Sequence, residues 1–213
     1  MSKINNLPVI WNGPKSSEKI VILAHGAGAP MDTDFMNFFA EYLAEHNVRV
    51  LRFEFPYMAL RREGHGRRPP NPQKTLLASW RQIISECRNQ HSGPIYIGGK
   101  SMGGRMASMI ADECDVDGLV LLGYPFYAPG KRDKPRIEHL LNIKTSTLIL
   151  QGERDPMGSK EVVESYGLSD AIKTIWLADG NHDLRPRVKS GSSHDDNLNC
   201  AALEIVKFVQ NTV

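Results

Sequence analysis

One serine in this sequence lies in a pattern that can make its hydroxyl group reactive. Residues 98–104 read GGKSMGG, so Ser101 has Gly99 two positions before it and Gly103 two positions after it. A short apolar run precedes this pattern, and a helix-like segment over Arg105–Asp112 follows it. A sharp turn between a strand and a helix needs glycine at both places and exposes the central hydroxyl above the sheet. We therefore interpret Ser101 as a candidate nucleophile, although a glycine-rich turn with an idle serine has the same pattern.

A serine hydroxyl is a weak nucleophile near neutral pH, so it needs a base, and the base needs an orienting acid. Asp155 and His182 follow Ser101 in the chain, and each comes soon after an apolar run typical of a strand. Because the carboxyl ends of parallel strands meet at one edge of a sheet, these three side chains can meet there. We expect His182 to act first as general base and then as general acid, with Asp155 holding its ring.

Two alternatives to this assignment stay open in the sequence. Glu153 is two residues before Asp155 and could supply the acid, although its place directly after Gly152 suits that role less well. His194 and Asp195 could replace His182, but they follow a loop rather than a strand.

The negative charge that forms on a substrate carbonyl oxygen needs two backbone N–H donors. Met102 follows the candidate nucleophile and supplies the first donor. The second is expected in the loop of small residues after the first buried run, where we choose Ala27, with Gly28 as the alternative. We expect His25 in the same loop to hold its shape rather than to transfer a proton.

Alternating apolar runs and helical patterns predict the elements that must position these residues. Runs typical of strands in a parallel sheet cover Ile20–Ala24, Val48–Phe53, Ile95–Gly98, Gly118–Leu122, Thr147–Leu150 and Lys173–Leu177, with an edge strand near Val9–Trp11. Helices are predicted over Phe35–Leu43 with Asp32 or Thr33 as cap, Thr75–Gln90, Arg105–Asp112, about Ser159–Tyr166 and about Asn197–Val209, with a short helix near Ile137–Leu141. Residues 54–74 are expected to form a long irregular connection rich in Arg and Pro, and residues 124–144 another long connection. The pattern predicts one α/β domain over residues 1–213, with a mainly parallel central sheet and helices on both faces.

Composition narrows the function classes further. The chain has 213 residues, 41% of them hydrophobic and 23% charged, with a net charge of +2, which is too mild to indicate nucleic-acid binding. Its three cysteines have no metal-ligand spacing, and we expect neither a metal nor a cofactor. A signal-peptide pattern and an apolar run long enough to cross a membrane are not evident, so we predict a cytoplasmic protein with no membrane partner. The oligomeric state is not indicated.

Five stretches together resemble a known superfamily: HGAGAP, GGKSMGGRMAS, LLGYPFYAPG, QGERDP and GNHDL. The chain is similar to small α/β-hydrolases of the dienelactone-hydrolase-like kind. It most resembles predicted bacterial hydrolases related to a testis-expressed vertebrate protein and to a subunit of the NSL histone-acetyltransferase complex. The resemblance implies the α/β-hydrolase fold and a Ser-His-Asp triad, and the chain is too short for a large cap domain. Dienelactone hydrolase uses cysteine where this chain has Ser101, so its lactone substrate is not implied.

Two function classes follow from these observations. The first is a serine hydrolase that cleaves a small ester or thioester substrate through an acyl-enzyme. The second is a binding or scaffold module on a hydrolase fold with little activity, which the resemblance to a complex subunit allows.

The predicted long connections are rich in basic residues, namely Arg61, Arg62, Arg67, Arg68 and Lys74 in the first and Lys131, Arg132, Lys134 and Arg136 in the second. Such runs are commonly solvated surface, but here they leave the same sheet edge as Ser101. Three nearby prolines restrict the backbone around Arg67 and Arg68, and arginine binds carboxylate or phosphate through a two-point fork. We therefore name Arg67 and Arg68 as candidate contacts to an anionic substrate.

Overall fold

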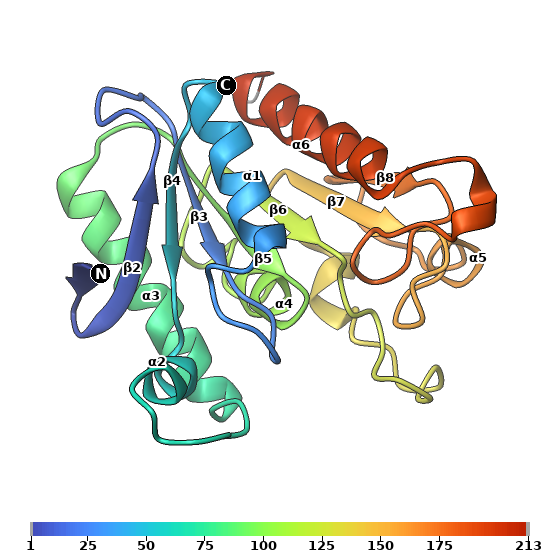
Figure 1. The fold of residues 1–213 in the computed structure, drawn as a ribbon, viewed down its shortest axis with the longest axis horizontal. Coiled ribbons are helices and arrows are strands. Elements are labelled where there is room, and N and C mark those ends of the chain that lie inside the picture. The colour runs from blue at the N-terminus through green and yellow to red at the C-terminus, as the bar shows by residue number, and fades with distance from the viewer. Residues whose placement is uncertain (1, 212–213) are drawn as a thin grey trace.

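The computed structural model describes residues 2–211, and within them eight strands form one sheet (Figure 1). The spatial order is β1-β2-β4-β3-β5-β6-β7-β8. The strands are β1 (Ser2–Ile4), β2 (Leu7–Asn12), β3 (Ile20–Ala24), β4 (Arg49–Phe53), β5 (Ile95–Lys100), β6 (Gly118–Leu122), β7 (Thr147–Gly152) and β8 (Ile172–Leu177). The ends of the predicted domain, residue 1 and residues 212–213, lie outside the described residues.

The sheet is mainly parallel, as the run of buried apolar segments predicts. Strands β3 to β8 pair in parallel, with Ile22 opposite Leu51 on one side and opposite Ile97 on the other. Strand β2 pairs antiparallel with β4 and with β1, which lies at the edge of the sheet. The fold-class prediction is confirmed. Strand β1 was not predicted, because its residues are two exposed polar side chains and one half-buried isoleucine, which form no apolar run.

Helices cover both faces of the sheet because alternate strand residues point to opposite sides. In β3, Ile20 and Ile22 join the core under α3 (Gln73–Gln90) and α4 (Met102–Ser108). Val21 and Leu23 join the core under α1 (Asp34–Glu45) and α6 (His194–Asn211). In Figure 1, α1 and α6 lie in front of the sheet, and α3 and α4 lie behind it. Burial on both faces explains why these strands read as continuous apolar runs.

The helices are α1 (Asp34–Glu45), α2 (Pro56–Arg62), α3 (Gln73–Gln90), α4 (Met102–Ser108), α5 (Lys160–Val163) and α6 (His194–Asn211), with 3-10 turns at Glu138–Leu141 and Val188–Ser190. Thr33 caps α1, because its hydroxyl oxygen accepts a hydrogen bond from the Met36 N–H at 3.3 Å. Helix α4 starts at Met102, three residues before the predicted start. Helix α5 is one turn, much shorter than predicted, since residues 164–171 lie at the surface or half-buried.

The prediction that residues 54–74 are irregular is wrong in part, because α2 lies within them. Pro56 is the first residue of this helix, a position where its fixed backbone and missing N–H are favourable. Tyr57 and Met58 are buried, while the helix ends in Arg61 and Arg62. With so few buried positions, the helix has too weak an apolar pattern to stand out in the sequence.

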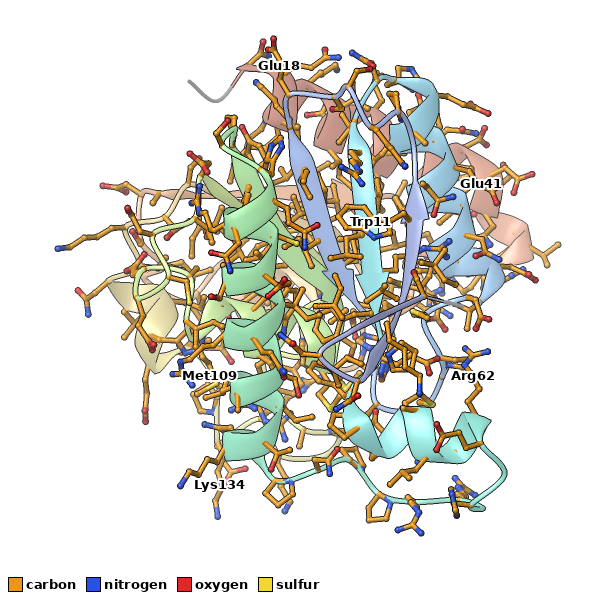
Figure 2. All side chains as sticks on the ribbon, turned by 90° about the vertical axis from the view of Figure 1, so that its left-hand side faces the viewer. Trp11, Glu18, Glu41, Arg62, Met109 and Lys134 are labelled. Atoms are coloured by element: carbon orange, nitrogen blue, oxygen red, sulfur yellow. The ribbon has the colours of Figure 1, made fainter. Side chains whose placement is uncertain are left out.

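Both basic connections lie at the end of the sheet toward which the parallel strands point. Figure 2 places Arg62 and Lys134 at the lower end of the molecule, and Glu18 at the opposite end. The carboxyl ends of the parallel strands therefore face a rim with several basic side chains, as the sequence predicts.

Candidate active site

Ser101 lies in a strained turn between β5 and α4. Its backbone angles are φ 50° and ψ −114°, a conformation that side chains other than glycine rarely adopt. The Ser101 N–H donates to the Leu122 carbonyl at 3.0 Å, which fixes the turn to β6. A Cβ atom on Gly99 would overlap the carbonyl oxygen of Ala24, and one on Gly103 would overlap that of His25. Both glycines therefore let the turn approach β3 closely, as the GGKSMGG pattern predicts.

The structure brings the three predicted triad side chains together. His182 Nε2 lies 2.9 Å from the Ser101 hydroxyl oxygen, and His182 Nδ1 lies 2.7 Å from Asp155 Oδ2. Asp155 is fully buried, while the His182 side chain is 20% exposed. A base thus contacts the hydroxyl group, and an acid contacts the other nitrogen of that base. This is the geometry in which a histidine can take a proton from a serine.

Asp155 is held by partners that the sequence analysis did not identify. Gln151, the buried residue near the end of β7, donates from Nε2 to Asp155 Oδ2 at 2.8 Å. The Gln151 amide oxygen accepts from the Tyr124 N–H at 2.7 Å, and the Met157 N–H donates to Asp155 Oδ1 at 2.8 Å. These donors compensate a carboxylate that is removed from water. The feature of the sequence that could have indicated this role of Gln151 is a glutamine inside the apolar run TLILQG.

The alternative residues lie elsewhere. Glu153 accepts a hydrogen bond from the Asp179 N–H at 2.9 Å and pairs with Lys160 at 3.6 Å. His194 Nε2 lies 2.9 Å from the carbonyl oxygen of Asp183, at the start of α6. Of the candidates that the sequence left open, the structure therefore joins Ser101, His182 and Asp155.

His25 stabilises the loop after β3, as expected. It is fully buried, its Nε2 accepts from the Phe55 N–H at 3.2 Å, and its Nδ1 donates to the Gly26 carbonyl at 2.7 Å. These contacts assign the proton of the neutral ring to Nδ1. Burial lowers the pKa of His25 to about 4, against a smaller opposing contribution from the Gly26 contact. A neutral ring with both nitrogens engaged is suited to holding a loop.

Tyr57 from α2 also anchors this loop. Its hydroxyl group lies 3.0 Å from the Ala27 carbonyl oxygen and 3.3 Å from that of Gly26. The Gly26 carbonyl and the Ala27 N–H belong to one peptide unit, and they point in opposite directions. Because His25 and Tyr57 hold the Gly26 carbonyl, the Ala27 N–H faces away from them.

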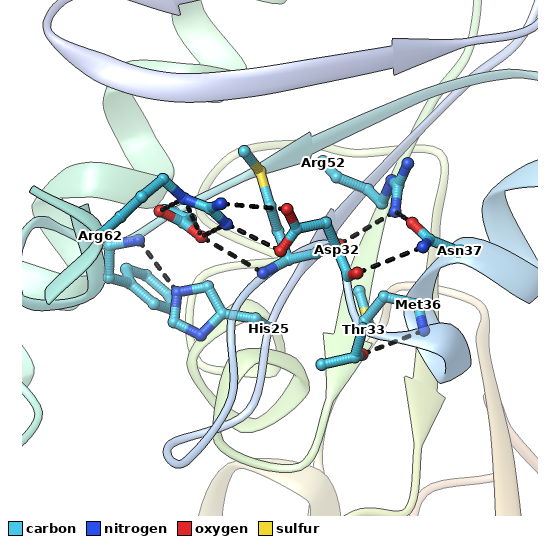
Figure 3. A network of polar contacts seen from close by, with 10 residues as sticks. His25, Asp32, Thr33, Met36, Asn37, Arg52 and Arg62 are labelled. Atoms are coloured by element: carbon cyan, nitrogen blue, oxygen red, sulfur yellow. Dashed lines mark hydrogen bonds and ion pairs between the residues drawn. The ribbon is translucent and has the colours of Figure 1, made fainter. Parts of the chain in front are cut away.

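A network of charged side chains fixes the far end of the same loop (Figure 3). Arg62 forms forked contacts to Asp32 at 2.7 and 3.0 Å and to Glu54 at 2.5 and 3.0 Å. Glu54 in turn accepts from the Met31 N–H at 3.4 Å, and Arg52 donates to the Met31 carbonyl at 3.0 Å. Arg62, one of the basic residues at this edge of the sheet, therefore has a structural role.

Lys100 connects the turn that carries Ser101 to the loop that carries His182. Its ammonium group donates to the His182 carbonyl oxygen and lies 3.2 Å from Asp183 Oδ1. The side chain is nearly buried, and burial lowers the pKa of Lys100 although Asp183 acts in the opposite direction. Lys100 was not predicted as a site residue; its feature in the sequence is a charge between the glycines of GGKSMGG.

Two cavities flank Ser101. The first, of about 400 Å³, has mainly apolar walls that include Pro30, Phe35 and Met36, and Lys100, His182 and Asp183 also line it. The second, of about 450 Å³, is lined by Ala27, Asn71, Gln73, Leu76, Met102, Arg105, Met106, Arg136 and neighbouring residues. Ala27 and Ser101 line both cavities, and Met102 lines the second. The two residues predicted to supply the oxyanion donors thus both line the second cavity beside Ser101, and their role as donors stays a prediction.

The structure does not place Arg67 and Arg68 in either of these cavities. Both are exposed, and the Arg68 carbonyl accepts a hydrogen bond from Arg61. Their proposed role in substrate binding stays a prediction. The arginines that do line the second cavity are Arg105 and Arg136.

The family described as alpha/beta hydrolase domain matches residues 17–210 of this chain. The chain belongs to this family. Membership of the α/β-hydrolase family supports a hydrolase function. The narrower resemblance to a testis-expressed protein and an NSL-complex subunit stays a prediction.

Solved structures show the same α/β-hydrolase fold across almost the whole chain. A Xanthomonas campestris protein described as an a/b serine hydrolase without lid has 16% identity and a TM-score of 0.74, covering 97% of this chain and 91% of its own. Dienelactone hydrolase from Anabaena variabilis has 18% identity and a TM-score of 0.72, with coverages of 99% and 95%. Est1E from Butyrivibrio proteoclasticus, with ferulic acid bound, has 17% identity and a TM-score of 0.71, with coverages of 97% and 95%.

Over residues 2–211, the helices of this α/β-hydrolase chain are each too short or too polar to cross a bilayer.

Proposed function

We propose that this chain is a serine hydrolase that cleaves an ester or thioester through an acyl-enzyme. The hydrogen-bonded series from Ser101 through His182 to Asp155 carries this proposal. Similar structures, which include one described as a serine hydrolase without lid and an esterase domain from Rhodothermus marinus, support it as an analogy.

In the first half-reaction, the Ser101 oxygen attacks the substrate carbonyl carbon while His182 Nε2 takes the hydroxyl proton. Asp155 stabilises the resulting imidazolium ion. The N–H groups of Ala27 and Met102 bind the oxyanion of the tetrahedral intermediate. Met102 is the first residue of α4, where an N–H has no acceptor within the helix. The intermediate then collapses, and His182 returns the proton to the departing alcohol or thiol.

In the second half-reaction, water replaces the leaving group. His182 takes a proton from the water molecule, whose oxygen attacks the acyl carbon, and the oxyanion again lies between Ala27 and Met102. Collapse of this intermediate breaks the bond to Ser101, which regains its proton from His182. The two cavities on either side of Ser101 suit a substrate with a group on each side of the scissile bond.

Labelling with a fluorophosphonate tests the nucleophile directly, because this reagent forms a stable phosphonyl ester with an activated serine. Intact mass spectra should show one adduct on the wild-type protein and none on Ser101→Ala. The exposed Ser92→Ala variant is a matched control and should label normally. An adduct on Ser101→Ala would place the nucleophile elsewhere.

Turnover of a panel of 4-nitrophenyl esters with increasing acyl length separates an enzyme from a binding module. Hydrolysis that depends on Ser101 supports the proposal. A wild-type protein that neither labels nor hydrolyses any ester would favour the binding or scaffold alternative.

A further inference from the structure

The second cavity beside Ser101 contains two arginines, Arg105 and Arg136. They come from different elements, since Arg105 lies on α4 and Arg136 lies in the connection after β6. Neither residue was singled out in the sequence as a substrate contact, and Arg105 lies outside the two basic connections.

Arg105 is placed close to Ser101 by the helix itself. Its N–H donates to the Ser101 carbonyl at 2.9 Å, so it lies one helical turn after the candidate nucleophile. Side chains of a helix lean toward its N-terminus, which in α4 is the end where Ser101 lies. The Arg105 side chain is partly buried, which restricts its freedom.

Arg136 is fixed through its backbone. Its N–H donates to the Phe126 carbonyl at 2.6 Å, and its own carbonyl accepts from the Tyr124 hydroxyl at 2.9 Å. Residues 129–135 of the same connection are exposed, whereas Arg136 is partly buried. The connection therefore ends at a fixed point that places the Arg136 side chain at the cavity.

These two arginines lack the acidic partners that other arginines near this edge have. Arg62 pairs with Asp32 and Glu54, and Arg154 pairs with Asp179 at 2.7 Å. Among residues 2–211, neither the Arg105 nor the Arg136 guanidinium has a hydrogen bond or an ion pair, and Arg105 Nε is buried without a partner. A buried donor without an acceptor costs free energy that a bound ligand can recover.

The electrostatic surroundings agree with this geometry. Burial lowers the pKa of Arg105, Tyr124 acts in the opposite direction, and the positive charge of Arg136 lowers the pKa again. Two neighbouring cations without an anion between them repel each other. Asn71 also lines this cavity. Its Oδ1 accepts a hydrogen bond from the Tyr57 N–H at 2.8 Å, so its side-chain N–H groups are left as donors for a ligand.

We propose that Arg105 and Arg136 together bind an anionic group of the substrate, a carboxylate or a phosphate, in the second cavity. This inference rests on the proposed hydrolase function and narrows its substrate class to anionic esters or thioesters. The planar guanidinium fork suits two-point contacts to either group, and the partly enclosed cavity strengthens them. The first cavity, with its apolar walls, would then accept the uncharged part of the substrate.

Kinetics on matched ester pairs test the proposal. The first pair, mono-4-nitrophenyl glutarate and 4-nitrophenyl pentanoate, places the carboxylate on the acyl side. The second pair, 4-acetoxybenzoate and its methyl ester, places it on the leaving group. In at least one pair, kcat/KM for the anionic member should exceed that of the neutral member by about tenfold or more, after spontaneous hydrolysis is subtracted.

Variants assign this preference to residues. Arg105→Gln and Arg136→Gln should each lower the ratio to about twofold or less, whereas Arg136→Lys should keep part of it because the charge remains. Arg88→Gln, at an exposed position of α3 that lines neither cavity, is the matched control and should keep the wild-type ratio. Arg67→Gln/Arg68→Gln tests the alternative contacts that the sequence pointed to. A ratio near one in the wild-type protein, or a ratio that Arg105→Gln and Arg136→Gln leave unchanged, would overturn the proposal. Loss of the ratio only in the Arg67→Gln/Arg68→Gln variant would do the same.

Binding without turnover separates this proposal from the proposed hydrolase function. Calorimetric titration of the Ser101→Ala variant with glutarate and with inorganic phosphate measures the site alone and shows which anion it prefers. Binding should weaken by about tenfold when Arg136→Gln is added. If Ser101→Ala binds anions but the wild-type protein hydrolyses no ester, the hydrolase proposal is refuted and the anion site is supported. Ester turnover without anion preference or anion binding would refute the site but support the hydrolase.

Discussion

The ammonium group of Lys100 donates a hydrogen bond to the backbone carbonyl of His182. The residue before the candidate nucleophile thus holds the backbone of the candidate base, 82 positions further along the chain. The ion pair of Lys100 with Asp183 adds a second contact to the same loop. We therefore interpret Lys100 as a positioning residue, because its ammonium group contacts the loop that carries His182.

Replacing Lys100 by methionine should lower kcat by about ten- to a hundredfold while KM changes little, since a small misplacement of a catalytic group has effects of this size. Methionine keeps most of the side-chain volume but lacks the charged donor. Lys74→Met, at an exposed position of α3, is the control. Steady-state kinetics and a thermal unfolding curve check the result. A normal kcat in Lys100→Met would show that the loop is held without this contact.

The acid of the triad can be assigned by two isosteric changes. Asp155→Asn should lower kcat by about four orders of magnitude, because an amide cannot stabilise the imidazolium ion or hold the required tautomer. Glu153→Gln should stay within a few-fold of the wild type, since Glu153 contacts Asp179 and Lys160 instead of His182. The opposite ranking of the two variants would move the acid to Glu153.

The stability of the fold should depend on pH through His25. Its folded-state pKa of about 4 is below the ordinary value of 6.5, so the unfolded chain binds a proton more readily than the folded protein. The stabilisation from the neutral ring is complete above pH 6.5 and is lost progressively as pH falls toward 4. Between about pH 7.5 and about pH 5 the contribution amounts to about 2 kcal/mol of unfolding free energy.

Urea unfolding at these two pH values measures the effect. The carboxylates titrate mainly below this window, so they contribute little to the difference. A His25→Asn variant removes the titrating group and should show a smaller difference between the two pH values than the wild type. Equal differences in both proteins would mean that His25 is not the group responsible.

Close packing of the turn against β3 should make Gly103 intolerant of a side chain. A Cβ atom there would overlap the carbonyl oxygens of Ala24 and His25, both of which are backbone atoms. Gly103→Ala should therefore destabilise the protein by about 1–3 kcal/mol and slow fluorophosphonate labelling. Gly28→Ala is the matched control for stability, because no atom lies within 4 Å of a Cβ built there. Similar unfolding midpoints for the two variants would contradict this account.

Part of the site follows from local sequence alone. The glycines around Ser101 mark a sharp turn between a strand and a helix, and the buried strands appear as continuous apolar runs because helices cover both faces of the sheet. Parallel strands also place Ser101, Asp155 and His182 at a common edge, whatever the details of packing. For these reasons the fold class and the meeting of the three side chains could be predicted without coordinates.

Tertiary structure decided the contacts between segments that are distant in the sequence. The sequence does not show that Gln151 accepts a hydrogen bond from the Tyr124 N–H, that Lys100 holds His182, or that Tyr57 holds the loop of Ala27. Each of these contacts depends on how separate connections fold back over the sheet edge, and no periodic pattern encodes that path.

The path of the connections also explains why the sequence pointed to different arginines than the structure does. Arg67 and Arg68 were predicted because basic residues are frequent around them in the sequence, but both are exposed. Arg105 and Arg136 are partly buried and line the same cavity as Ser101. A solvated guanidinium and a cavity-lining one are identical in sequence. The sequence determined the sheet edge and the chemistry gathered there, because strand burial and turn geometry are local. Only the three-dimensional path of the connections decided which charges face the reacting group, because that path sets each side chain's access to water and to its neighbours.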